Sequence, residues 1–330
     1  MNFLGATSGE NLSITPLSAT SATIQAGGLA ASFNVSNTQF ISLSLTGANN
    51  QLAIDGNAPG LTFAANAGEA GVVGDILIFY SGLQYGSIAF NGTGGGNTLI
   101  VDSSLGAVRA PIDFNGGAGG GNSLVLQGGA ATSDAYSPGP GLGEGTSTLV
   151  IGGVTESVHF VNLAPVIDTV AGPLVVNGTA GDDAINYSAD PASPSRGLVS
   201  VNNLETISFL NKTTLTLDAG AGSDTINLND PTTPTGLTGI TVNGGDPAGS
   251  GDTLVVNGTT GADAINYAIN SATSSTITGA GPVSITGNDV EQVLLNGRGG
   301  GDTFRVTTAA GIDQVTTIRW PTATRTTRFR

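Results

Sequence analysis

The residues best placed to do chemistry in this sequence are aspartates that follow a glycine turn and precede an aliphatic residue. The clearest copy runs from Gly220 through Asp224 to Ile226. The same setting recurs at Asp182, Asp183, Asp252, Asp263 and Asp302. Glycine allows a tight turn, and carboxylate and carbonyl oxygens are the donors that hard cations such as Ca²⁺ prefer. The same pattern also suits plain β-turns, in which Asp bonds to nearby backbone, so both interpretations start from it.

The pattern Gly-x-Gly-x-Asp-x-apolar resembles the calcium-binding repeat of hemolysin-type (RTX-like) secreted and surface bacterial proteins. The resemblance covers residues 90–306 and implies a parallel β-roll with Ca²⁺ between the turns of successive coils. It assigns the ligand role to these aspartates, chiefly Asp183, Asp224, Asp263 and Asp302. It assigns the core role to Ile185, Ile226, Ile265 and Phe304.

The spacing of the motifs departs from that family. RTX arrays repeat a unit of about nine residues in tandem, whereas Asp183 and Asp224 are 41 residues apart and Asp224 and Asp252 are 28 apart. In the first half of the chain, Asn97 and Asn122 stand where the aspartate is expected, and a neutral amide is a weaker ligand. A shared calcium site therefore requires turns that are distant in sequence to be neighbours in space. With no cysteine and one histidine, the chain lacks ligands for softer metals.

Internal repeats divide the chain into four regions. Residues 174–187 and 254–267 match at 12 of 14 positions and lie 80 residues apart, so residues 167–316 hold two copies of one unit. Residues 86–166 contain glycine-rich repeats with Asn in place of Asp, and residues 1–85 form a more degenerate β-repeat region. Residues 317–330 are an anomalous basic tail, interpreted either as a partner-binding segment or as the product of a reading-frame slip.

Short runs of alternating apolar and polar residues between turns predict an all-β protein. The 52 glycines and the aromatic content of 5% favour a right-handed parallel β-helix or β-solenoid, whose coils stack identical turns in rows. An array of β-sandwich units is the alternative, because Asn177-Gly178 and Asn257-Gly258 are typical hairpin turns.

Net charge and hydropathy exclude some classes of partner and indicate where the protein is located. A net charge of −15 argues against nucleic acid, which needs clustered Lys and Arg. The apolar runs are far shorter than the roughly 20 residues of a spanning helix, so no membrane insertion is expected. Residues 1–20 show no signal peptide. We expect a fragment of an extracellular or cell-surface protein whose partners are calcium and a cell-surface or matrix polysaccharide or protein.

Few residues are candidates for catalysis, and we predict no catalytic residue and no organic cofactor. His159, the single histidine, lies in a strand-like alternation and is expected to face solvent. Glycine-rich stretches lack the Lys-Ser/Thr of a P-loop, and no nucleophile elbow is present. The predicted function is therefore structural or adhesive, with a carbohydrate-active β-solenoid enzyme, of the polysaccharide lyase or hydrolase type, as the alternative. The threonine-rich stretch 273–278 is local, and no threonine array repeats at a fixed period, so an ice-binding face is not predicted.

Overall fold

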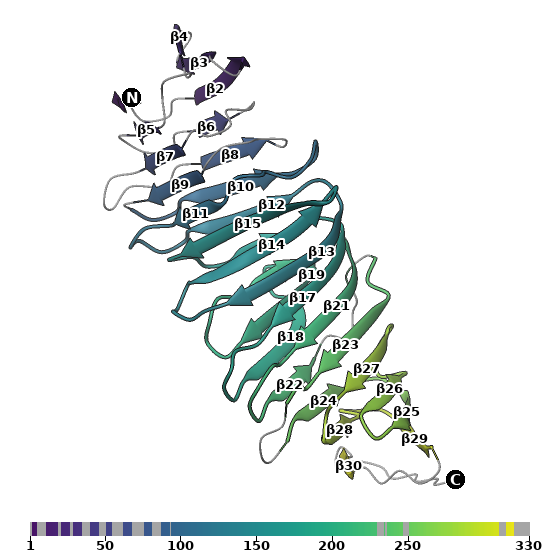
Figure 1. The fold of residues 1–330 in the computed structure, drawn as a ribbon. Coiled ribbons are helices and arrows are strands. Elements are labelled where there is room, and N and C mark those ends of the chain that lie inside the picture. The colour runs from purple at the N-terminus through teal and green to yellow at the C-terminus, as the bar shows by residue number, and fades with distance from the viewer. Residues whose placement is uncertain are drawn as a thin grey trace. The chain divides into compact units, whose positions relative to one another are not determined.

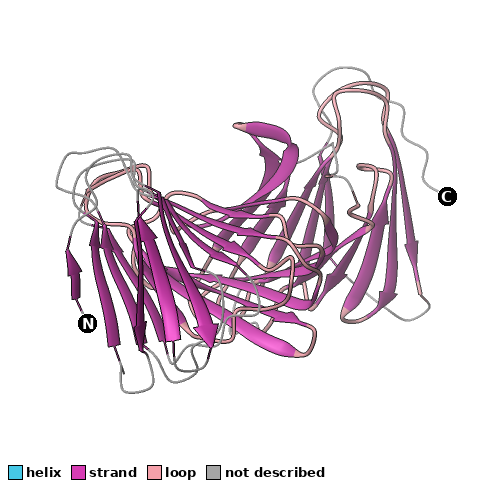
Figure 2. Ribbon diagram, turned by 90° about the horizontal axis from the view of Figure 1, so that it is seen from above, coloured by secondary structure: helices cyan, strands magenta, loops and turns pink. Residues whose placement is uncertain are grey.

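The computed structural model describes residues 87–92, 94–229, 234, 236–246 and 251–309 in full, and the backbone alone of strands β1–β8 and β30. All of its elements are strands, which confirms the all-β prediction (Figures 1 and 2). Because these residues include no helix, none of them forms a helix that could cross a membrane. The basic tail from residue 320 on, and the side chains of residues 1–86, lie outside the described part.

The strands form two large mixed sheets, here called sheet A and sheet B. By its contacts the chain divides into two compact units, residues 1–172 with 204–207 (unit 1) and residues 173–203 with 208–330 (unit 2). In both units, consecutive strands commonly alternate between the two sheets, so a strand that alternates in this way pairs with a strand that does not directly follow it in the chain.

Unit 1 begins with eight strands: β1 (Asn2–Leu4), β2 (Asn11–Ser18), β3 (Ser21–Ala26), β4 (Leu29–Asn34), β5 (Phe40–Leu45), β6 (Gln51–Ile54), β7 (Thr62–Ala67) and β8 (Ile76–Tyr80). In sheet A, β9 (Ser87–Gly92) and β11 (Ile112–Asn115) are parallel neighbours, and in sheet B so are β10 (Thr98–Asp102) and β12 (Ser123–Gln127). The antiparallel strands β13 (Ala131–Pro138), β14 (Gly145–Ile151) and β15 (Val154–Val161) extend sheet A, and β16 (Val166–Asp168) follows β12 in sheet B.

In unit 2, sheet A contains β17 (Gly172–Asn177), β21 (Lys212–Asp218), β23 (Gly239–Asn243), β25 (Ala264–Ser271), β26 (Ser274–Thr278), β27 (Ser284–Asn288) and β29 (Thr303–Thr308). Sheet B contains β18 (Ala184–Asp190), β19 (Ser193–Val201), β20 (Ile207–Phe209), β22 (Thr225–Leu228), β24 (Thr253–Asn257), β28 (Gln292–Asn296) and β30 (Val315–Arg319). The row β18–β22–β24–β28–β30 is parallel throughout, and antiparallel hairpins are inserted at β18–β19 and at β25–β26–β27.

The core follows the period-two alternation of the strands, with one side chain buried and the next turned outward. Rings in equivalent positions stack, as Phe90 does on Phe114 with ring centroids 5.1 Å apart. Ile185, Ile226 and Ile265 are buried, as the sequence predicted. Phe304 is only half-buried, because β29 is the last strand in the order of sheet A and has a neighbour on one side only.

The Asn-Gly pairs do not form the hairpins that the β-sandwich alternative took them to indicate. Asn177-Gly178 leads from β17 in sheet A to β18 in sheet B. Asn257-Gly258 leads from β24 in sheet B to β25 in sheet A. Both pairs therefore connect strands of different sheets.

Candidate functional site

The aspartates of the glycine turns occupy equivalent places, each one residue before a strand. Asp183, Asp224 and Asp252 precede β18, β22 and β24 of sheet B, whereas Asp263 and Asp302 precede β25 and β29 of sheet A. These strands pair in parallel register, so the residues just before them also lie next to one another. We call these positions the acidic corners. Parallel pairing thus brings together turns that are far apart in the sequence.

Hydrogen bonds link the sheet B corners into a row. The amide N–H of Asp183 donates to Oδ1 of Asp224 at 2.8 Å, and the amide of Asp224 donates to Oδ1 of Asp252 at 2.8 Å. The amide of Asp252 then donates to Oε2 of Glu291 at 2.6 Å. Glu291 was not predicted as part of the site. Its position directly before β28 is the signal that could have identified it.

The sheet A corners form a shorter row of the same kind. The amide of Asp263 donates to Oδ1 of Asp302 at 3.1 Å. Within its own turn, Asp263 accepts the amide of Thr259 at 2.8 Å and the Thr259 hydroxyl at 3.0 Å. Asp183 accepts the amide and the hydroxyl of Thr179 in the same way. The first corner of each row, Asp183 or Asp263, therefore closes its own turn with its carboxylate. The later corners, Asp224, Asp252 and Asp302, use theirs to accept the amide of the preceding corner.

Asp182 lies apart from the row of Asp183. Its side chain is exposed, and its Oδ1 accepts the amide of Ser223 at 2.8 Å. The structure therefore places five of the six predicted metal ligands in two corner rows and turns the sixth toward solvent.

In unit 1, asparagines form corners of the same design. The amide N–H of Asn97 donates to Oδ1 of Asn122 at 2.9 Å, which matches the bond from Asp183 to Asp224. The side-chain NH₂ of Asn97 donates to the carbonyl of Gly116 at 3.0 Å, and that of Asn122 donates to the carbonyl of Asn162 at 3.0 Å. A carboxamide can accept and donate at once, so these corners are satisfied by protein atoms alone.

A carboxylate lacks that donor, and two corner oxygens are left without a partner. Oδ2 of Asp224 and Oδ2 of Asp252 are buried, in residues that are 1% and 0% exposed, and accept no hydrogen bond from the part of the chain that the structure describes. An ionised oxygen in this position loses its hydration without compensation, which is unfavourable unless a proton or a cation joins it.

The same environment shifts the acidity of both groups. Burial raises the pKa of Asp224 to about 6, against the lowering effect of the bond from the Asp183 amide, and the charge of Asp252 adds to the rise. Burial also raises the pKa of Asp252, with the neighbouring charge of Glu291 acting in the same direction. Stacked carboxylates thus disfavour one another's ionised form.

The donors at the corners suit a hard cation in kind, because all are oxygens. Near Gly178, Oδ2 of Asp183 and the carbonyl oxygen of Ala219 converge on the space that a side chain would fill. Near Gly244, Oδ2 of Asp252 and the carbonyl of Asp289 do the same. Within the described ranges, no three His, Asp or Glu side chains are grouped so that they could hold a metal ion. Carbonyl groups and solvent would have to supply the remaining ligands.

Ladders of asparagine at the other strand ends were not predicted. The side-chain amide of Asn296 donates to Oδ1 of Asn257 at 3.0 Å, and that of Asn257 donates to Oδ1 of Asn229 at 2.6 Å. Asn288 donates likewise to Asn243 at 3.0 Å. One ladder connects β22, β24 and β28, and the other connects β23 with β27. Both add side-chain hydrogen bonds to the backbone hydrogen bonds between these strands.

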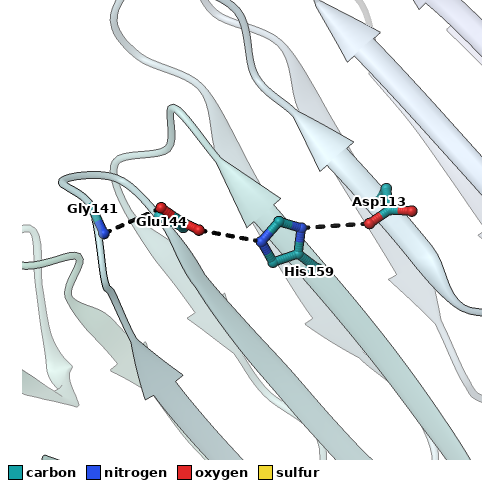
Figure 3. A network of polar contacts seen from close by, with 4 residues as sticks. All are labelled: Asp113, Gly141, Glu144 and His159. Carbon is teal, nitrogen blue, oxygen red and sulfur yellow. Dashed lines mark hydrogen bonds and ion pairs between the residues drawn. The ribbon is translucent and has the colours of Figure 1, made fainter. Parts of the chain in front are cut away.

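His159 lies on β15 between two carboxylates (Figure 3). Its Nδ1 is 3.4 Å from Oδ1 of Asp113, and its Nε2 is 3.6 Å from Oε1 of Glu144. The other oxygen of Glu144 accepts the amide of Gly141 at 3.1 Å. The His159 side chain is 47% exposed, which confirms that it faces solvent. Such exposed ion pairs contribute little to stability.

Glu156, which no motif in the sequence marks, is buried on the inner side of β15. Its Oε2 accepts the hydroxyl of Ser103 at 2.8 Å and the amide of Val108 at 2.7 Å, which ties the loop 103–108 to sheet A. Its Oε1 is buried and has no hydrogen-bond partner among the described residues. Burial raises the pKa of Glu156, and the charge of Asp168 adds to the rise.

No protein-family model matches this chain, and the comparisons with curated proteins and with solved structures found no match. Its function is therefore inferred from the corner rows and the faces of the two sheets.

Proposed function

We propose that the chain is a structural and adhesive segment of a large secreted or cell-surface bacterial protein, folded as a right-handed parallel β-solenoid. The observation that carries the proposal is the corner row, in which Asp183, Asp224, Asp252 and Glu291 stack through one repeated hydrogen bond. A solenoid places equivalent turns of successive coils in such rows. Alternation of consecutive strands between the two mixed sheets, with parallel pairing between many of them, supports the same architecture.

An array of β-sandwiches is less compatible with the pairing. Sandwich sheets are antiparallel, and their neighbouring strands are joined by hairpins. Here Thr98–Asp102 pairs in parallel with Ser123–Gln127, and Thr225–Leu228 pairs in parallel with Thr253–Val256. Antiparallel hairpins interrupt this pattern at β2–β4, β13–β15, β18–β19 and β25–β27.

The corner carboxylates already accept hydrogen bonds from the protein, which favours a scaffold over a carbohydrate-active enzyme. The corner carboxylates bind backbone amides, so their first role is to hold coils together. A partly open hollow of unit 2, bordered by Tyr187, Val256 and Ile285, has a volume of about 20 Å³, which is room for about one water molecule. The lyase or hydrolase alternative requires a cleft in which acids face Arg or Lys.

An insoluble-polysaccharide assay tests the adhesive role against the enzyme alternative. The full chain is incubated with insoluble cell-wall and matrix polysaccharides and with inert beads, and both bound protein and released sugar are measured. We expect retention on at least one surface above the bead background, without sugar release. Release of oligosaccharide would support the enzyme, and background retention on every surface would overturn the adhesive role.

We further propose that Ca²⁺ stabilises the acidic corners of unit 2. The unpartnered Oδ2 atoms of Asp224 and Asp252 support this proposal, because a cation there would compensate buried negative charge. A ligand that binds only the folded state, present at about ten times its Kd, adds about 1.4 kcal/mol to the free energy of unfolding. Extracellular calcium modules commonly work at Kd values of about 10⁻⁴ to 10⁻³ M.

Thermal melts of the full chain in millimolar CaCl₂, in MgCl₂ and in a chelator test the calcium proposal. We expect Ca²⁺ to raise the Tm of the wild type by several degrees and to leave the Asp224→Asn/Asp252→Asn double variant unchanged. Identical melts of the wild type in all three conditions would show that the corners are plain turns. An equal Ca²⁺ response of the double variant would place the ion elsewhere.

A further inference from the structure

The outer face of sheet A in unit 2 carries two rows of hydroxyl side chains, here called the hydroxyl array. In the first row, Thr216 of β21 pairs with Thr241 of β23, Thr241 pairs with Thr286 of β27, and Thr286 pairs with Thr276 of β26. The second row lies two residues away on the same strands and comprises Thr214, Gly239, Ser284 and Thr278. Seven of these eight positions are therefore Thr or Ser.

The array faces outward because the residues between its two rows point inward. Leu215, Ile240, Ile285 and Ile277 are at most 5% exposed, and side chains alternate between the faces of a strand. The hydroxyl of Thr276 accepts a bond from Asn270 at 2.8 Å. Among the described residues, the other six hydroxyls of the array form no hydrogen bond with the protein.

Backbone geometry fixes the positions of these hydroxyls. Neighbouring strands are about 4.8 Å apart, and residues two apart on one strand are separated by about 6.7 Å, so the array is a grid with those two spacings. Threonine is β-branched and has a restricted χ1, so its hydroxyl and methyl hold defined directions. Little conformational entropy would be lost when such a grid meets a rigid partner.

The chemistry of the grid selects the partner. The array contains no charged residue, so it offers nothing specific to an ion or a charged polymer. It contains no aromatic residue, whereas the apolar faces of sugar rings pack best on aromatic side chains. Each threonine offers one O–H donor, two acceptor lone pairs and a methyl group. A regular surface of water molecules held in fixed positions complements such a grid.

We propose that the hydroxyl array is an ice-binding face. The inference rests on the proposed adhesive role, since it names the surface to which the segment attaches. Thr216, Thr241 and Thr286 come from three parallel strands, whereas Thr276 comes from the antiparallel strand β26. Their sequence spacing is therefore irregular, with intervals of 25 residues from Thr216 to Thr241 and 45 from Thr241 to Thr286.

Ice-affinity capture of the full chain tests the inference. The fluorescently labelled protein is equilibrated with slowly growing ice, and its concentration in the ice is compared with that in the liquid. The Thr241→Lys/Thr286→Lys double variant places two long cations in the first row. Thr148→Lys makes the matched change on an outward-facing residue of β14 in unit 1. A thermal melt of each variant verifies that it is folded.

We expect the wild type and Thr148→Lys to be enriched in the ice several-fold over a non-binding control protein, and the double variant to be excluded. Exclusion of the folded wild type overturns the inference, as does capture of the folded double variant at the wild-type level. Should the double variant fail to fold, the conservative Thr241→Val/Thr286→Val variant replaces it, with reduced capture expected. Retention on polysaccharide without capture by ice would overturn the ice inference alone and leave the adhesive role in place.

Discussion

Oδ1 of Asp224 accepts the backbone N–H of Asp183 at 2.8 Å, across 41 residues of sequence. The bond continues the ladder between β18 and β22 one residue beyond the strands, at the point where the backbone turns away. Asn122 performs the same task for Asn97 in unit 1. The acid at this corner is therefore first a backbone acceptor, and any cation would join an arrangement that the protein already forms.

Replacement of Asp224 by Asn and by Ala should separate these roles. Asp224→Asn keeps the Oδ1 acceptor and adds an NH₂ donor, as in Asn97, so in a chelator we expect it to be at least as stable as the wild type. Asp224→Ala leaves the buried amide of Asp183 without its acceptor and should cost about 1–3 kcal/mol. Urea denaturation of both variants measures the difference. Equal losses in Asn and Ala would contradict the acceptor role.

The pH dependence of stability should depend on Glu156. Its pKa is raised by burial above the ordinary 4.5, so the folded state binds more protons than the unfolded state near that pKa. The protonated Glu156 side chain therefore stabilises the folded state fully below pH 4.5, and this stabilisation is lost as the pH rises through the pKa of the folded state. The free energy of unfolding falls over that range by no more than about 1.4 kcal/mol per pH unit. Glu156→Gln should flatten that part of the curve and raise the stability at pH 7. Denaturation curves between pH 4 and pH 8 provide the measurement.

The matched control for Glu156 is Asp113→Asn, which removes a carboxylate whose side chain is 66% exposed. We expect Asp113→Asn to leave the slope of stability against pH close to that of the wild type. If the free energy of unfolding of both Glu156→Gln and Asp113→Asn varied with pH in parallel with that of the wild type, the prediction that burial of Glu156 makes stability depend on pH would be contradicted.

The asparagine ladder gives a third prediction. The side chain of Asn257 donates to Oδ1 of Asn229 and accepts from Asn296. Asn257→Asp removes the donor and places a negative charge beside Oδ1 of Asn229. We expect a loss of about 1–3 kcal/mol in the free energy of unfolding, from a polar group left without its partner. Asn186→Asp, on the outward-facing side of β18, is the control and should change stability by less than about 0.5 kcal/mol. Equal effects at the two positions would argue against the ladder.

Two glycines of one turn give a fourth prediction. A Cβ on Gly178 would overlap the carbonyl oxygen of Ala219 and contact Oδ2 of Asp183, whereas a Cβ on Gly181 would meet only the Thr179 hydroxyl at 4.0 Å. Gly178→Ala should cost about 1–3 kcal/mol through overpacking of the corner. Gly181→Ala should be close to neutral. The Tm values of the two variants measure the difference. An unchanged Tm for Gly178→Ala would contradict close packing of this corner.

The sequence by itself determined the kind of structure and the positions of the corners. Alternating Val, Ile and Leu between glycine turns made an all-β chain predictable, because strand formation and turn geometry depend on local residue types. The setting of Asp224 and Asp252 before aliphatic strands likewise marked them as corner residues. Ile185 and Ile226 are buried, in agreement with the core role that the resemblance to the calcium-binding repeat assigned to them.

Only the tertiary structure decided which corners meet and which side chains share a face. Parallel pairing joins strands separated by an entire return through the other sheet, and no local pattern specifies the length of that return. Glu291 follows Asn288-Asp289-Val290 and not a glycine turn, so it does not match the corner pattern in the sequence. The inserted hairpins change the length of the return, which hid the row of Thr216, Thr241 and Thr286 from any sequence period. Unpartnered oxygens such as Oδ2 of Asp252 depend on burial, and burial is a property of the stacked sheets and not of the motif.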